Sequence, residues 1–287
     1  MTLRERRRGG TAMDVDETLR RVADGEGLPR EAMQWALDHW DESAPRLLAR
    51  LAAFAARSDS FDVGGSEAFY TVHLCGEREE RGAYAPLCRL IACDRNIDDW
   101  LGDAVTETLP GILINVFGGD LDLLKRAIES PAGYEFARAS ALAALGYLVR
   151  SRRLVGDDGM RDYLKRLRLD MQPRRRSIVW MAWAETVANL GYADLRGDVE
   201  WLIAIGFIPG EFDLDAFDRQ VLLARSDAAG LAGFESDFVS PLKNAIAALE
   251  RLSGVSDRAC EREASRQIMA PPNLFVFTRA GRSPPAA

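Results

Sequence analysis

The sequence predicts an all-α protein in which antiparallel helical hairpins stack in a row, and three observations support this fold class. Apolar residues recur at three- and four-residue steps, as in Leu142, Leu145 and Val149, which places them on one face of a helix. Alternation with a period of two between turn residues is nearly absent, so no sheet is expected. A short motif also recurs about every 40 residues, the period of two-helix repeats.

The composition is that of a globular chain. Of its 287 residues, 47% are hydrophobic and 28% are charged. A chain of this length buries roughly three quarters of its unfolded surface, so the fold needs neither disulfides nor metal ions. The four cysteines form no disulfide framework, which favours a reducing compartment and a cytoplasmic location. No apolar run is long enough to span a membrane, and no apolar stretch follows the first arginines to make a secretory signal.

Capping residues predict where helices begin and end. Ser66 is expected to cap one helix with its hydroxyl. Gly118–Gly119 can end a helix in the left-handed region, and the Asp120 carboxylate can cap the next one. Pro110 interrupts a helical run from Asp98 to Phe117, so it either kinks that run or begins a second helix.

A four-residue motif, Leu-x-Arg followed by Leu or Ala, indicates an internal repeat. The copies occupy residues 48–51, 87–90, 124–127, 164–167 and 249–252. The first four copies follow one another at nearly constant steps, and the fifth lies about two further steps on. A hairpin of this size has an apolar face that is buried only when the next hairpin stacks on it. The predicted architecture is therefore an α-α superhelix, a solenoid of HEAT or armadillo type.

The predicted superhelix occupies residues 14–253. Residues 1–13 are expected to be a disordered basic extension, and Met13 is an alternative start of the chain. Residues 254–287 hold four prolines and are expected to be a mostly irregular tail. Within that tail the short apolar stretch Leu274–Phe277 can dock on the helical body as an extended segment.

Charge is distributed in three blocks of alternating sign, although the whole chain has a net charge of -7. Residues 94–135 carry nine acidic and three basic side chains, residues 150–176 carry four and ten, and residues 194–218 carry seven and one. One interpretation is that neighbouring repeats neutralise one another. The other is a basic groove for an acidic partner, flanked by acidic walls. Because the chain has a negative net charge, a nucleic acid is the less favoured acidic partner.

An acidic ridge is the strongest candidate for chemistry. Asp99, Asp103 and Glu107 are four residues apart and would share one face of a continuous helix, where carboxylates repel one another. Carboxylate-rich sites suit Mg²⁺, Mn²⁺ or Ca²⁺. A solvated or salt-bridged ridge is the alternative, and a catalytic metal site would need further residues from other helices.

Two other groups of charged residues are candidates. Glu185 is the one charge in a very apolar helix, so it must find a partner or take a raised pKa. An arginine of another repeat would make it a core anchor, and a raised pKa would suit a catalytic acid. The run Arg174, Arg175 and Arg176 belongs to the basic block, and together with the acidic ridge it supplies the predicted binding residues.

The remaining motifs give no chemistry. His73 shares a face with Phe69 and is expected to be a satisfied core histidine, and His39 is expected to pack beside Trp35. Two histidines and scattered cysteines do not make a zinc site. There is no dinucleotide-binding glycine motif, phosphate-binding loop or nucleophile elbow. We therefore predict no catalytic residue, no metal and no cofactor.

The segment around the acidic ridge resembles a known family. Asp98–Asp103, Thr106–Glu107, Gly119–Leu121 and Arg138 are similar to positions of the bacterial domain-of-unknown-function family 1186, and the resemblance covers roughly residues 66–218. It implies a HEAT-like helical repeat protein with no assigned activity, so no catalytic residue carries over. Some members end in a cysteine-rich zinc-binding motif. After Cys93 this chain has only Cys260, so no zinc module is expected.

These observations predict a scaffold that binds a protein or peptide on a curved helical surface without catalysis. One alternative is a metal-assisted enzyme centred on Asp99, Asp103 and Glu107. Another is nucleic-acid binding through residues 150–176. No membrane partner is expected, and the sequence does not indicate an oligomeric state.

Overall fold

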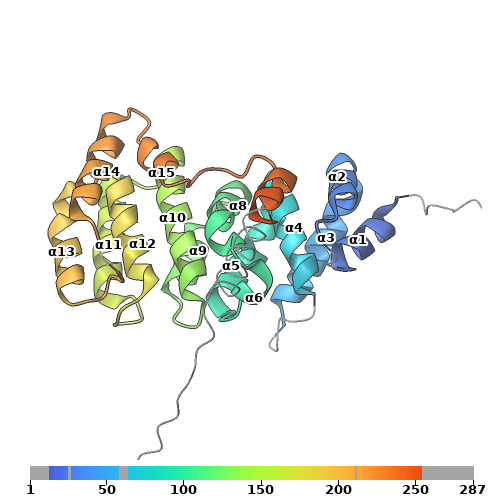
Figure 1. Ribbon diagram of the computed structural model, residues 1–287, viewed down its shortest axis with the longest axis horizontal. Helices are drawn as coiled ribbons and strands as arrows, with labels where there is room; N and C mark the ends of the chain where they lie inside the picture. The colour runs from blue at the N-terminus through green and yellow to red at the C-terminus, as the bar shows by residue number, and fades with distance from the viewer. Residues whose placement is uncertain (1–12, 25–26, 58–63, 211, 254–287) are drawn as a thin grey trace, which may run out of the picture. The chain divides into compact units, whose positions relative to one another are not determined.

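The computed structural model describes residues 13–24, 27–57, 64–210 and 212–253. Throughout these ranges every regular element is a helix and none is a strand (Figure 1). The predicted all-α class is therefore confirmed.

The chain divides into two compact units, residues 1–249 and residues 250–287. Of the second unit only residues 250–253 are described, and they are helical. The predicted extension, apart from Met13, and the predicted tail with Leu274–Phe277 lie outside the described residues. No helix in the described ranges is both long enough and apolar enough to cross a membrane.

The helices of the first unit are mostly short, and two of them are single 3-10 turns. In chain order they are α1 (Val15–Asp24), α2 (Arg30–Asp38), α3 (Trp40–Ala55), α4 (Gly65–Glu77), η1 (Arg81–Ala83), α5 (Tyr84–Cys93), α6 (Asp98–Leu101), α7 (Ala104–Glu107), α8 (Leu109–Val116), α9 (Leu121–Glu129), α10 (Glu135–Arg152), α11 (Asp157–Asp170), α12 (Ile178–Asn189), η2 (Ala193–Leu195), α13 (Arg196–Ala204), α14 (Leu214–Ser226) and α15 (Ala232–Ser236). Residues 245–249 are also helical.

Two sets of helices pack side by side along the first unit. One set follows the contacts of α4 with α8, α8 with α10, α10 with α12, and α12 with α14. The other set begins with the contacts of α3 with α5 and of α5 with α9. In Figure 1 the early helices α1 to α3 lie towards the right, α4, α5 and α8 lie near the middle, and α9 to α13 lie towards the left.

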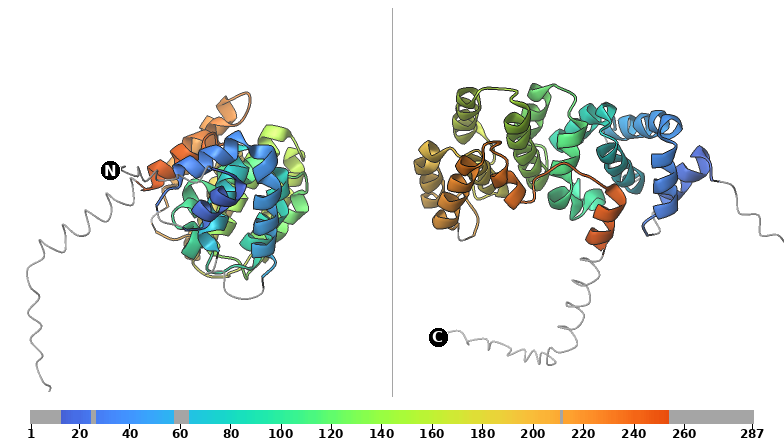
Figure 2. Two further views of the ribbon diagram at one scale, coloured as in Figure 1. Left: turned by 90° about the vertical axis from the view of Figure 1, so that its right-hand side faces the viewer. Right: turned by 90° about the horizontal axis from the view of Figure 1, so that it is seen from above.

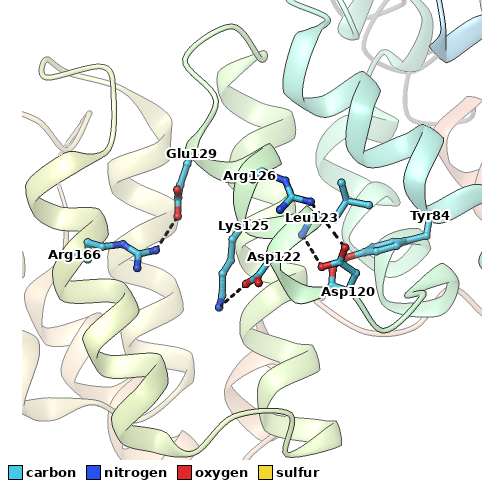
Figure 3. A network of polar contacts seen from close by, with 8 residues as sticks. All are labelled: Tyr84, Asp120, Asp122, Leu123, Lys125, Arg126, Glu129 and Arg166. Atoms are coloured by element: carbon cyan, nitrogen blue, oxygen red, sulfur yellow. Dashed lines mark hydrogen bonds and ion pairs between the residues drawn. The ribbon is translucent and has the colours of Figure 1, made fainter.

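Polar contacts continue the second set of helices beyond α9 (Figure 3). At its start, the Tyr84 hydroxyl of α5 donates to the Asp120 carbonyl oxygen, 2.6 Å away and 36 residues later in the chain. Arg166 of α11 lies 3.1 Å from Glu129 of α9, at a separation of 37 residues. Arg168 of α11 lies 3.0 Å from Asp198 of α13, and these two residues are 30 positions apart in the sequence. Polar contacts therefore join α5 to α9, α9 to α11 and α11 to α13.

Helix boundaries confirm some capping predictions and correct others. Asp120 caps α9, since its Oδ1 accepts from the Leu123 amide at 3.0 Å. Pro110 begins a new helix, the second of its two predicted outcomes, because it stands in the first turn of α8. Ser66 is not a cap. Gly64, at a φ of 91°, precedes the first residue of α4 and takes that place.

Arg138 of α10 is a charged residue in the core, only 1% exposed. Its Nε donates to the Ile128 carbonyl oxygen at 2.8 Å, and its Nη2 donates to the Gln172 carbonyl oxygen at 2.6 Å. Burial lowers the pKa of this guanidinium. Arg138 therefore joins the end of α9 to the loop before α12, and these carbonyls satisfy a charge that has no carboxylate partner among the described residues.

We expect Arg138→Ala to lower the free energy of unfolding by about 3 kcal/mol, because it leaves a cavity and two carbonyls without their charged donor. Urea unfolding followed by circular dichroism measures this change. Arg176→Ala, at an exposed arginine, is the matched control and should change stability by less than about 0.5 kcal/mol. Equal small effects of both substitutions would contradict the role of Arg138.

Candidate functional site

The acidic ridge does not exist as one helical face, so that prediction is wrong. Gly102, at a φ of 53°, ends α6, and a second short helix, α7, begins at Ala104. Asp99 lies on α6, Asp103 precedes α7 and Glu107 ends it. All three are exposed, and their carboxylates make no ion pair with another described residue. The break removes Asp99 from the helical register of Asp103 and Glu107, whereas these two stay one helical turn apart, with the Glu107 amide donating to the Asp103 carbonyl oxygen at 3.1 Å.

The same segment contains an acidic residue that sequence reasoning missed. Asp94 is 3% exposed and lies between α5 and α6. Its carboxylate accepts from the Trp100 indole at 3.0 Å and from the Asn96 amide at 2.9 Å. Burial raises the pKa of Asp94. This carboxylate fixes the turn that positions Trp100 and Asp99 beside Phe69, at a pocket of about 540 Å³.

No metal centre emerges from these carboxylates. Among the described residues, no three His, Cys, Asp or Glu side chains stand close enough together to hold a metal ion. His73 is a satisfied core histidine, as predicted, because its ring nitrogens lie 2.6 Å from the Phe69 carbonyl oxygen and 2.8 Å from Thr108 Oγ1. Burial lowers the pKa of His73 to about 4, so it stays neutral. The geometry therefore gives the metal-assisted enzyme no support.

The three arginines of residues 174–176 have different surroundings. The Arg174 guanidinium lies over the rings of Trp180 and Phe207 at 5.3 and 5.2 Å, so its role is packing. Arg175 lies 3.7 Å from Glu135 and lines a pocket of about 440 Å³ that does not include the acidic segment. Arg176 is exposed and has no partner among the described residues. The structure thus leaves Arg175 and Arg176 available at the surface.

The basic block pairs with both neighbouring acidic blocks. Arg166 and Arg175 face Glu129 and Glu135 of the preceding block. Arg161 lies 3.2 Å from Asp194, and Arg168 pairs with Asp198, both in the following block. Of the two predicted interpretations, these contacts favour neutralisation between neighbouring helices. Each exposed pair contributes about 0–1 kcal/mol, and four of the ten basic side chains of the block are neutralised by neighbouring acidic blocks in this way.

Glu185 is exposed and is not the core anchor that the sequence suggested. It lies on the outer stripe of α12, and no arginine pairs with it among the described residues. The surrounding protein, and then the Asp237 carboxylate, raise the pKa of Glu185 to about 7. Burial also raises the pKa of Asp237, although a hydrogen bond from Asn189, 2.7 Å away, opposes the shift. The carboxylates of Glu185 and Asp237 therefore lie near each other where the chain leaves α15.

Beyond α15 the chain crosses back over α8, and we call residues 237–244 the crossing segment (Figures 1 and 2). It turns at Phe238, whose φ is 60°, and passes close to Gly111. The Asn115 amide of α8 donates to the Leu242 carbonyl oxygen at 2.7 Å and to the Gly76 carbonyl oxygen of α4 at 2.8 Å. Asn115, a lone polar residue in an apolar run, was the available signal in the sequence.

The contact at Gly111 depends on the absence of a side chain. A Cβ added there would lie 2.6 Å from the Ser240 carbonyl oxygen. Just beyond the crossing segment, the Ala245 amide donates to Glu77 at 2.7 Å. The surface of α4 and α8 thus holds this segment through hydrogen bonds to its backbone and through the packing of Leu242 beside Gly76. This surface is the candidate functional site.

We expect the raised pKa of Glu185 to lower stability as pH rises. The folded protein holds this proton up to about pH 7, whereas the unfolded chain releases it near pH 4.5, so the folded state loses stability through that window. Thermal unfolding of wild type and Glu185→Gln at pH 5, 6, 7 and 8 measures the effect. The thermal midpoint of the variant should rise relative to that of wild type as pH increases. A difference in midpoint that stays constant from pH 5 to pH 8 would contradict the raised pKa of Glu185.

Comparisons with known proteins place the chain in a family. The family described as "Protein of unknown function (DUF1186)" matches residues 13–208. A relative from Chlamydia muridarum (strain MoPn / Nigg), described as "Uncharacterized protein", is 26% identical over 194 residues, which cover 67% of this chain and 77% of the relative. No solved structure matches. Because the family match covers more than half of the chain, this protein belongs to the DUF1186 family.

Proposed function

We propose that this protein is a non-catalytic helical-repeat scaffold that binds an extended segment of a partner protein across α4 and α8. The observation that carries the proposal is the crossing segment, which lies on this surface in an extended form. A surface that holds one extended chain through backbone hydrogen bonds presents the groups needed to hold another.

The pattern of helix contacts supports a HEAT-type superhelix as the scaffold. Contacts between alternate helices, such as α8 with α10 and α10 with α12, are what stacked hairpins produce. The polar links from α5 to α9 and from α9 to α11 recur at sequence separations of 36 and 37 residues, close to the period of the sequence motif. In such an array the helices of one set form a shared surface along which an extended chain can lie.

The contacts define the chemistry of the partner segment. Asn115 and Glu77 recognise a backbone carbonyl and a backbone amide, so they place few demands on side chains. The Leu242 side chain packs on the surface next to Gly76. The expected partner is therefore a polypeptide with an extended stretch, an apolar side chain at one position and a helix start shortly after it.

Exposed charges outside this surface extend the proposal. We expect Asp99, Asp103 and Glu107 on one side, and Arg175 and Arg176 on another, to contact outlying parts of the partner. Rim charges of this kind mainly affect the association rate and the choice of partner. A cytoplasmic location is also proposed, because Cys75, Cys88 and Cys93 are free thiols.

A peptide added in trans tests the proposal. In wild type the covalently attached segment is present at an effective concentration near millimolar and excludes a free peptide. Leu242→Asp should release the segment, because it puts a charge against apolar groups near Glu77. A fluorescent peptide with the wild-type sequence of residues 237–249 should then bind the full-length variant saturably in fluorescence anisotropy, with at least about a tenfold higher affinity than it has for wild type.

Two controls identify the binding surface. Adding Gly111→Val to the released variant should abolish binding, because the new side chain occupies the place of the Ser240 carbonyl. A peptide carrying the Leu242→Asp change should not bind. Leu242→Ser provides a milder release if the aspartate prevents folding, as judged by circular dichroism. A folded, released chain that fails to bind the wild-type peptide would disprove the proposal.

A further inference from the structure

A second candidate site lies at the C-terminal end of α10, where four arginines line one pocket of about 590 Å³. Arg150 and Arg153 come from the end of α10, Arg161 from α11 and Arg225 from α14. Pockets that hold small molecules typically measure about 300–1,000 Å³. The volume and the convergence of charge from three helices indicate a binding site for a small anion.

The acidic residues of this pocket are already engaged. Asp227 accepts backbone hydrogen bonds from Leu231 at 2.7 Å and from Ala229 and Ala232 at 3.1 Å, which lower the pKa of its carboxyl group. Asp157 accepts from the Tyr192 hydroxyl at 3.1 Å and lies 3.4 Å from Arg150. These two carboxylates therefore stabilise the loop and the pocket wall.

The arginines are only partly neutralised. Arg161 pairs with Asp194 and lies over the Tyr192 ring at 4.2 Å. Arg153 and Arg225 are exposed and make no ion pair or hydrogen bond with another described side chain. The buried Nε of Arg150 also lacks a hydrogen-bond partner among the described residues. The pocket thus presents two unpaired guanidinium groups, those of Arg153 and Arg225.

Two glycines position the arginine side chains. A Cβ at Gly191 would lie 2.8 Å from Cγ of Arg225, and a Cβ at Gly230 would lie 2.7 Å from Cδ of Arg150. Both glycines have a positive φ, of 74° and 68°. The arginine stems therefore lie directly against backbone, which holds their guanidinium groups at the pocket.

Arg153 occupies a backbone position that suits glycine. It ends α10 at a φ of 49° and a ψ of 42°, in the left-handed region. This conformation costs a residue with a side chain about 1 kcal/mol relative to glycine. An arginine at this position places a charge at the pocket where glycine would give the more stable helix end. Binding of an anion by the Arg153 guanidinium would explain why an arginine stands at this position.

We propose that this pocket binds a small molecule that carries phosphate groups. Guanidinium groups bind phosphate oxygens in pairs with charge-assisted hydrogen bonds, and several of them together match an anion with two or more charges. The volume of about 590 Å³ suits a small ligand, whereas the negative net charge of the chain disfavours a nucleic acid.

Calorimetric titration of the full-length protein with inorganic pyrophosphate at low ionic strength tests this site. We expect saturable binding at one site per chain. Arg225→Gln should weaken it about tenfold or more. Arg153→Gly should weaken it similarly while leaving the thermal midpoint unchanged or higher, because glycine relieves the left-handed conformation. A merely structural role for Arg153 does not produce that combination.

Arg176→Gln is the matched control, since it removes an exposed, unpaired arginine outside the pocket, and it should leave pyrophosphate binding unchanged. Citrate serves as the carboxylate comparison and should bind at least about tenfold more weakly. The proposal is overturned by an absence of saturable pyrophosphate binding, by an equal loss in Arg176→Gln, or by citrate binding as tightly as pyrophosphate. Leu242→Asp should not affect this binding, which separates the pocket from the proposed peptide surface.

Discussion

The structure depends on the close approach of α10 to the helices around it. This helix contacts α5, α7, α8, α9 and α12, and most of its residues are buried. Small residues make the approach possible: a Cβ added at Gly146 would lie 2.9 Å from the Phe234 ring and 3.0 Å from Thr186. Interiors packed at this density tolerate little change in volume. The position of α10 in turn sets the positions of its neighbours.

Hydrogen bonds and ion pairs of polar side chains connect helices in addition to the apolar packing. Near the start of α10, Arg138 donates to the carbonyl oxygens of Ile128 and Gln172, and at the other end of the helix Arg152 donates to the Ile114 carbonyl oxygen of α8 at 3.1 Å. Between the outer helices the connections are ion pairs, such as Arg166 with Glu129. Residues of oppositely charged blocks thus form ion pairs between neighbouring outer helices, such as α9 with α11 and α11 with α13. Their individual contributions are small, but they oppose mismatched pairing of neighbouring helices.

Local patterns in the sequence are enough to predict the helices and the Asp120 cap, because both depend on neighbouring residues. They do not reveal the break at Gly102, since the inward apolar pattern continues across it, and the expected acidic ridge therefore does not form. Neither candidate site is predicted, because each joins segments that are distant in sequence: Asn115 meets Leu242 across 127 residues. A count of charge over residues 150–176 likewise does not distinguish paired arginines from unpaired ones, and only the fold makes that distinction.

The two sites share one rigid support. Arg152 ties the last turn of α10 to Ile114, and the next residue of α8, Asn115, holds the crossing segment. Arg153, which follows Arg152 at the end of α10, belongs to the arginine pocket. Since α8 and α10 are both buried and packed together, the surface for an extended chain and one wall of the pocket are set by the same helix pair. The same packed helix pair thus supports both proposed surfaces, one where Asn115 bonds the crossing segment and one where arginines remain unpaired.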